Sequence, residues 1–191
     1  MMRATLVVTC TVVVACAHPA PRGPVAVTDA AAAPKRASCG DAPAAYLAEL
    51  CAMDEPSLSV AGPESYRFVW TRHQRNPVAV RLTRAGATAI AVVAIEGDAQ
   101  DPTARRRHEF TVPNAVWIDL RKHLDAADFW NLPGDPTDDE RGLDGADWAL
   151  EGRRGGVYHS VIRWEPQPGP FRTACEDLIK VSGISFPAEI R

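Results

Sequence analysis

The sequence predicts an α+β fold: an antiparallel sheet, made of a four-strand meander plus a hairpin, with two helices packed on one face and a short N-terminal helix. From residue 64 onward, apolar and polar residues alternate in segments separated by short connections, which is the pattern of antiparallel strands. Residues 113–125 and 170–182 instead repeat apolar residues at helical spacing. These two segments are the predicted helices that cover the sheet.

Each strand is predicted from its own alternation. In the first, Tyr66, Phe68 and Trp70 share one face and polar residues share the other, so this strand is expected to be half-buried. The remaining strands of the meander are expected at residues 77–83, 88–96 and 108–112. The hairpin is expected to join residues 147–151 to residues 157–164 through the turn Gly155-Gly156. Asp41 is the predicted N-cap of the short helix over residues 42–50.

The first residues have the composition of an export signal, in which Arg3 precedes an apolar segment too short to span a bilayer. The motif Val13-Val14-Ala15-Cys16 resembles the lipobox of bacterial lipoprotein signals. This resemblance implies that residues 1–15 are removed and that Cys16 is lipidated and anchored in the membrane. The alternative is an ordinary secretory cut after Ala17, which would release a soluble protein. Both routes take the chain out of the cytoplasm, to the periplasm, the cell surface or the medium.

The Ala- and Pro-rich residues 16–36 show no sustained period and are predicted to be a flexible tether, which leaves residues 37–191 as a single domain. The net charge of -3 does not suit a nucleic-acid-binding protein. The densest basic run, Arg105-Arg106-Arg107 with His108, has no interleaved aromatic residues. We therefore expect it to form a solvated strand edge.

The cysteines suit an oxidising compartment. Once Cys10 leaves with the signal and Cys16 is lipidated, three thiols remain, so at most one intramolecular disulfide can form. Cys39 and Cys51 are the favoured pair. Cys175 lies on the apolar face of the last predicted helix and is expected to be a small buried thiol.

No metal or cofactor is predicted. Histidines 18, 73, 108, 123 and 159 show no pair at metal-ligand spacing, and the acidic segment from Asp135 to Asp147 does not match a calcium-binding loop. An acid/base group of Asp147, Glu151 and His159 is conceivable, since the hairpin brings its two strands together. The simplest hairpin register pairs Glu151 with Ser160 and leaves His159 on the opposite face.

A candidate recognition surface combines rings and cations at one end of the sheet. It consists of Trp70, Arg72, His73, Arg163 and Trp164.

Several motifs resemble those of a bacterial envelope protein family of uncharacterised activity. They are the segments 64–70, 77–81 and 129–133, the Gly-Leu-Asp-Gly-Ala-x-Trp-x-Leu-Glu-Gly motif at 142–152, and the Tyr-His-x-Val-x-Arg-Trp motif at 158–164. The resemblance implies that residues 64–183 belong to one domain, and it assigns no functional residue.

We therefore expect a lipid-anchored envelope domain that is non-enzymatic and binds an envelope protein or plays a structural role. The alternative is a small-molecule hydrolase or other enzyme that uses Asp144, Glu151 or His159.

Overall fold

The computed structural model describes residues 46–73, 75–95, 106–135, 142 and 145–183. Their secondary structure alternates strands with three α-helices and one short 3-10 helix, η1. In chain order the elements are α1 (Leu47–Ala52), β1 (Ser65–Arg72), β2 (Arg75–Ala85), β3 (Thr88–Ile95), β4 (Arg106–Val112), α2 (Asn114–Ala126), η1 (Phe129–Asn131), β5 (Ala146–Arg154), β6 (Val157–Trp164) and α3 (Pro170–Ser182).

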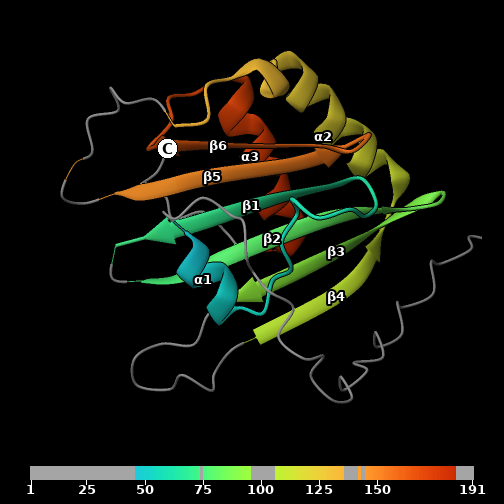
Figure 1. Ribbon diagram of the computed structural model, residues 1–191, viewed down its shortest axis with the longest axis horizontal. Coiled ribbons are helices and arrows are strands. Elements are labelled where there is room, and N and C mark those ends of the chain that lie inside the picture. Colours follow the sequence, from blue (N-terminus) through green and yellow to red (C-terminus); the bar gives the residue numbers. More distant parts are fainter. Residues whose placement is uncertain (1–45, 74, 96–105, 136–141, 143–144, 184–191) are drawn as a thin grey trace, which may run out of the picture. The chain divides into compact units, whose positions relative to one another are not determined.

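The strands form one antiparallel sheet in the order β4-β3-β2-β1-β5-β6 (Figure 1). The predicted α+β class with an antiparallel sheet is confirmed. The structure joins the predicted meander and hairpin into a single six-stranded sheet, because β5 pairs with β1 from Ser65 to Arg72. Strand β1 therefore lies between β2 and β5, and β5 lies between β1 and β6.

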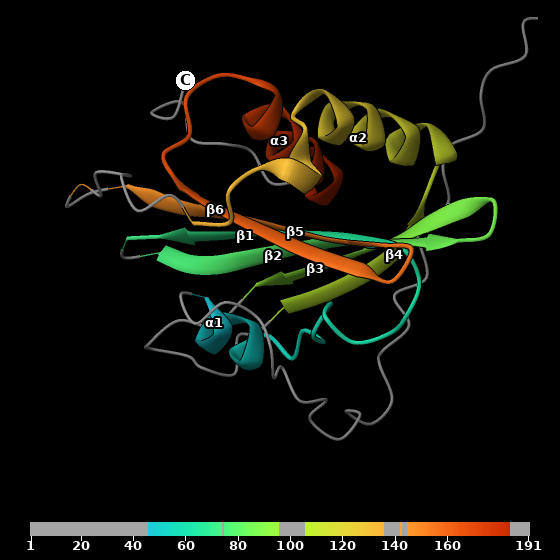
Figure 2. The ribbon, with the colours of Figure 1, turned by 45° about the horizontal axis from the view of Figure 1, so that its top comes forward.

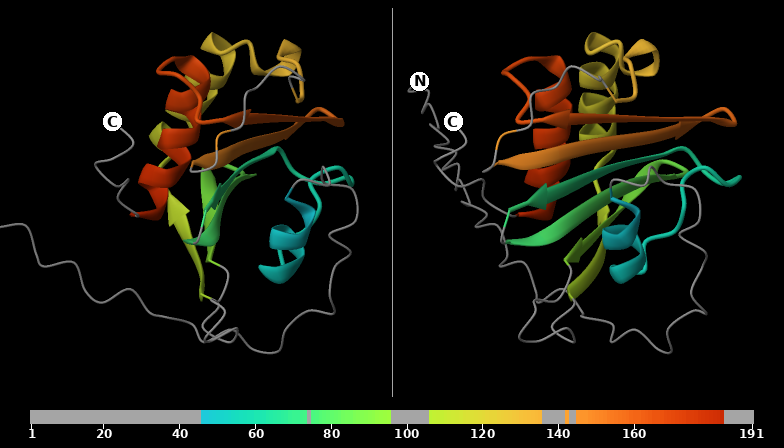
Figure 3. Two further views of the ribbon diagram at one scale, coloured as in Figure 1. Left: turned by 90° about the vertical axis from the view of Figure 1, so that its left-hand side faces the viewer. Right: turned by 60° about the vertical axis from the view of Figure 1, so that its left-hand side comes forward.

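Two layers of helix enclose the sheet. Figure 2 shows α2 and α3 on one face and α1 on the other, and Figure 3 shows the same arrangement from the side. Apolar residues of α2 and α3 form a continuous core with the sheet face beneath them, because each helix has one apolar side. We call this face, which carries Tyr66, Phe68, Trp70, Trp148 and Leu150, the helix face.

The opposite face of the sheet, which we call the α1 face, is also covered. Tyr46, Leu50 and Met53 pack there against Val69 and neighbouring sheet residues. The expectation that β1 is half-buried is therefore wrong: its first six residues are buried on both faces. Polar residues can lie on a covered face only if they are paired, and the charged partners that allow this come from distant parts of the chain.

The boundaries of two elements differ from the predicted ones. Helix α1 begins at Leu47 rather than at residue 42, while Asp41 lies outside the described residues. Strand β4 begins two residues earlier than predicted and so includes Arg106 and Arg107. Because β4 is an edge strand of the described sheet and its first four residues are exposed, the prediction of a solvated basic edge is confirmed for Arg106, Arg107 and His108, while Arg105 lies outside the described residues.

The hairpin has the predicted turn and register. Gly155 and Gly156 both have positive φ, +59° and +83°, as a type I′ turn requires. This two-residue turn pairs Glu151 with Ser160 and Gly152 with His159. The turn thereby decides which face each side chain of the hairpin occupies.

Candidate functional site

Glu151 and His159 lie on opposite faces of the sheet. Glu151 is in register with Arg67 on β1, whereas His159 is in register with Gly152, the next residue along β5. Successive residues of a strand point to opposite faces, so the carboxylate and the imidazole are separated by the sheet itself. Asp147 lies on the same face of β5 as Glu151, in register with Thr71, while Asp144, the further carboxylate considered, lies outside the described residues. Glu151 and His159 therefore do not form an acid/base pair.

Glu151 is part of a buried ion pair with Arg67, and both side chains are 0% exposed. Glu151 Oε2 accepts a hydrogen bond from Arg67 Nε at 2.5 Å, and Oε1 accepts one from the Tyr158 hydroxyl at 2.6 Å. Arg67 Nη1 also donates to the carbonyl of Pro56 at 2.6 Å. Both carboxylate oxygens are thus occupied by protein donors, which is the arrangement that a buried charge requires.

A second buried carboxylate, Glu55, lies just after α1 and is 1% exposed. Its Oε2 accepts a hydrogen bond from Arg81 Nε at 2.8 Å, and its Oε1 accepts one from Arg107 Nη1 at 2.6 Å. Arg67 Nη1 lies 3.5 Å from Oε2. Glu55 therefore connects the segment after α1 to β1, β2 and β4. The buried charge network, as we call it, consists of Glu55, Arg67, Arg81, Arg107, Glu151 and Tyr158.

Opposing effects act on the pKa of Glu55. Burial raises it, but the charges of Arg81, Arg67 and Arg107 and the hydrogen bond from Arg81 outweigh burial, so the pKa lies below its usual value of 4.5. Since the folded-state pKa is lowered, this group stabilises the fold in full above the unfolded-state pKa. That contribution is lost as the pH falls through the folded-state pKa.

We expect Glu55→Gln to destabilise the domain at pH 7 and to differ less from the wild type at pH 3, because pH 3 is below the ordinary pKa of 4.5 and part of the contribution of the Glu55 charge is lost there. Urea denaturation of both proteins at the two pH values measures this difference. An equal difference in unfolding free energy at pH 7 and pH 3 would show that the charge of Glu55 does not stabilise the fold.

Two tyrosines surround the same carboxylate. Burial raises the pKa of Tyr158, and the charge of Glu151 and the hydrogen bond to it raise it further. Burial also raises the pKa of Tyr46, and the charge of Glu151 adds to the effect. Both hydroxyls therefore stay protonated at neutral pH, and Tyr158 remains a donor to Glu151.

His159 holds the segment that follows η1 against the sheet. Its Nε2 lies 3.0 Å from the carbonyl oxygen of Leu132. Its ring packs edge-on against Phe129 at a centroid separation of 5.1 Å and lies 6.3 Å from the ring of Trp130. These contacts are those of a sheet residue hydrogen-bonded to the backbone of a segment 27 residues earlier in the chain.

The predicted recognition residues on β1 and just after it differ in their exposure to solvent. Trp70 is 0% exposed. The Arg72 guanidinium lies 4.2 Å from the centroid of the Trp70 ring and donates to the carbonyl of Asn76 at 3.0 Å. Arg72 is therefore partly exposed to solvent, whereas the indole of Trp70 is buried. His73, at the end of the strand, is exposed.

Arg163 and Trp164 are adjacent on β6 and therefore point to opposite faces. Arg163 donates to the carbonyl of Pro133 at 2.9 Å, and its guanidinium lies 5.7 Å from the Phe171 ring centroid. Trp164 packs over Gly145, where an added Cβ would collide with the indole. The five predicted residues share one end of the sheet but not one face, and their common recognition role stays a prediction.

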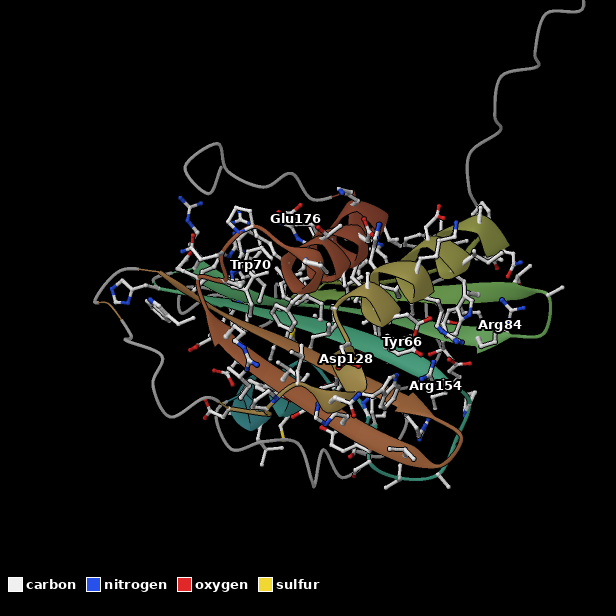
Figure 4. The ribbon with its side chains drawn as sticks, turned by 90° about the horizontal axis from the view of Figure 1, so that it is seen from above. Tyr66, Trp70, Arg84, Asp128, Arg154 and Glu176 are labelled. Carbon is white, nitrogen blue, oxygen red and sulfur yellow. The ribbon has the colours of Figure 1, made fainter. Side chains whose placement is uncertain are left out.

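A row of aromatic rings and arginines lies on the helix face. Tyr66 lies 5.4 Å from Trp117 and 6.3 Å from Trp130, and the guanidinium groups of Arg84 and Arg154 lie 5.7 and 4.9 Å from those two indoles. Figure 4 shows that Tyr66 lies near Arg154. It also shows Arg84, which lies on the β2–β3 hairpin. The alternation predicted a buried Tyr66, but it gave no signal for the arginines at the ends of the row, which come from other strands.

The two described cysteines differ in state. Cys51 is disulfide-bonded, while Cys175 is a free and fully buried thiol. Cys39 lies outside the described residues, so the Cys39–Cys51 pair stays a prediction. Burial raises the pKa of the Cys175 thiol, and the charge of Glu176 raises it further, so the reactive thiolate is disfavoured.

We expect Cys175 to resist alkylation in the folded protein and to react once the protein is unfolded. Mass spectrometry after iodoacetamide treatment, with and without guanidinium, measures this difference. Modification of Cys175 without denaturant would contradict its place in the core.

Within the described ranges, no group of three or more His, Cys, Asp or Glu side chains is arranged to hold a metal ion. The same part of the chain contains no helix of sufficient length and hydrophobicity to cross a membrane. Cys16 and most of the acidic segment tested for calcium spacing, including Asp138 to Glu140, lie outside it.

No protein-family model matches the chain, and no curated protein is similar to it in sequence. The resemblance of residues 64–183 to a bacterial envelope family therefore stays a prediction.

Proposed function

We propose that this chain is an exported bacterial envelope protein, anchored through a lipid on Cys16, whose folded domain binds an envelope protein or serves a structural role and is not an enzyme. The observation that carries the non-enzymatic part is the separation of Glu151 from His159 by the sheet. Each of these side chains is already bonded to other parts of the fold. These bonds hold the carboxylate and the imidazole on opposite faces, so the two do not meet at one place where a substrate could lie.

The anchor is supported by the sequence. The motif Val13-Val14-Ala15-Cys16 follows a short apolar segment, and residues 16–36 have the composition of a linker. A flexible chain of this length reaches roughly 25 Å. The domain would stand just clear of the membrane, facing the periplasm or the exterior.

We expect Cys16→Ser to move the protein from the detergent phase to the aqueous phase in a Triton X-114 partition, because the acyl chains contribute about 0.8 kcal/mol for each buried CH₂ group. Immunoblotting of the two phases measures the distribution. If the variant still fractionates with membranes, the lipobox interpretation is wrong or a partner retains the domain there.

The binding role is tested by capturing envelope proteins on the purified full chain, with a urea-unfolded sample as control. A partner that binds saturably to the folded protein supports the proposal. A reproducible turnover that His159→Gln abolishes in a folded protein would overturn it in favour of an enzyme.

A further inference from the structure

The two edge strands of the sheet differ in whether another described segment lies beside them. At the β6 edge, the segment after η1 lies alongside the strand: Ile162 N donates to the carbonyl of Gly134 at 2.7 Å, and Arg163 donates to Pro133. At the β4 edge, no backbone hydrogen bond from another described segment joins the outer side of the strand. An edge strand of this kind presents alternate N–H and C=O groups to which another extended chain can bind.

The side chains of β4 leave this edge accessible. Arg106, Arg107, His108 and Glu109 are all exposed, and only Phe110 and Val112 turn toward the core. The strand is long enough, from Arg106 to Val112, to pair with an ordinary strand of a partner. Charged residues at such an edge oppose unselective aggregation, so a partner must compensate their charge.

The charge of this edge is positive at its first half. Arg106 is in register with Ile95 and His108 with Val93, so both are on the helix face, while Arg107 is on the α1 face. On the α1 face, Arg107 bonds Glu55 and is followed by the acidic Glu109, so its charge is offset there. The exposed basic residues of the helix face, Arg106 and His108, are the ones that a partner can meet.

We propose that β4 is a docking strand that binds an extended acidic segment of a partner protein by strand addition. The segment pairs with the outer backbone edge of β4 and places carboxylates opposite Arg106 and His108. The main-chain hydrogen bonds hold the segment, and the carboxylates select it. This inference rests on the proposed binding function and assigns that function a surface and a partner chemistry.

The probe is a peptide of alternating threonine and glutamate, whose carboxylates all lie on one face when it is extended. It is titrated into the isotope-labelled full chain in a non-ionic detergent, and backbone amide shifts are followed by NMR. We expect shifts in residues 106–112 that saturate and that weaken at high salt. A threonine–lysine peptide is the charge control. An N-methylated threonine–glutamate peptide keeps the charges but cannot donate backbone hydrogen bonds to β4, so it should bind more weakly.

The double variant Arg106→Glu with His108→Glu should bind the acidic peptide at least about tenfold more weakly, with an unchanged melting temperature. Arg107 is left intact because it bonds Glu55. Lys122→Glu is the matched control, since Lys122 is 69% exposed on α2, away from β4. The wild-type peptide comparison does not depend on the folding of either variant.

Several outcomes overturn the docking strand: shifts confined to residues outside β4, equal binding of the N-methylated or lysine peptide, binding to phosphatidylglycerol vesicles but not to the acidic peptide, or concentration-dependent dimers through β4. If the wild type captures an envelope protein and the double variant captures it equally, β4 is not the docking site but the proposed binding function stands. If the wild type binds neither an envelope protein nor the peptide, both proposals are wrong.

Discussion

Replacing Arg67 by alanine is expected to destabilise the domain by about 3 to 5 kcal/mol, because the substitution leaves Glu151 as a buried charge without its cationic partner. Arg67 is 0% exposed and donates to Glu151 Oε2 at 2.5 Å. It also donates to the carbonyl of Pro56, so the segment after α1 loses a bond to the sheet as well. Such a loss is a large share of the 5 to 15 kcal/mol that stabilises a typical domain.

Urea denaturation at pH 7 measures this effect, and Arg154→Ala is a suitable control. Arg154 has the same side chain on a neighbouring strand, but its ion pair with Asp125 is long, at 3.6 Å, and Arg154 and Asp125 are 36% and 59% exposed. Exposed pairs contribute at most about 1 kcal/mol. If the two variants lose equal stability, the Arg67–Glu151 pair is not a buried charge pair in solution.

The double variant Arg67→Met with Glu151→Leu separates two contributions to the unfolding free energy. One is the cost of leaving Glu151 buried without a cationic partner, and the other is the net contribution of the ion pair. Replacing both partners of a buried ion pair by apolar residues is often close to neutral. We therefore expect the double variant to be more stable than Arg67→Ala. The remaining loss would report the contacts of Arg67 with Glu55 and Pro56 together with the hydrogen bond from Tyr158 to Glu151.

The buried charge network fixes α1 and the segment after it to the sheet. Glu55 bonds Arg81 and Arg107, while Arg67 bonds Pro56. This segment lies between the predicted tether and the first strand. These bonds add to the apolar contacts that Tyr46, Leu50 and Met53 make with the same face of the sheet.

Local patterns were enough to predict the hairpin. A two-residue turn fixes the register of both strands, so Gly155-Gly156 determined that Glu151 and His159 occupy opposite faces. A local pattern also placed Cys175 in the core, since the residues at i-4 and i+4 on its helix are apolar.

The sequence did not predict which strands pair when they are far apart in the chain. β1 pairs with β5, which puts Arg67 beside Glu151 although they lie 84 residues apart in the chain. Without that pairing, Arg67 in an alternating strand indicates a solvated face. The same limit applies to the predicted recognition surface. The sequence indicates which strand ends meet at one end of the sheet, but it does not indicate the packing that buries Trp70.

Trp148→Ala is expected to have a second large effect, a loss of about 3 to 5 kcal/mol, since it removes a large side chain from the centre of the core. Trp148 is 0% exposed, lies 5.2 Å from Phe68 and 6.1 Å from Trp70 between ring centroids, and is covered by the Arg172 guanidinium at 5.4 Å. No smaller side chain at this position can maintain all of these contacts. Thermal unfolding followed by circular dichroism should show a melting temperature lowered by at least about 10 °C.

Trp164→Ala is the matched control, because it makes the same substitution on the neighbouring strand at a side chain that is only partly buried. Its loss should be clearly smaller, and His159→Gln and Asp144→Asn should change the melting temperature less than Trp148→Ala does. The opposite ranking would contradict the assignment of Trp148 to the core. If Trp148→Ala stays as stable as the wild type but no longer captures a partner that the wild type binds, then Trp148 belongs to a recognition surface, and the binding site lies at this end of the sheet instead of at β4.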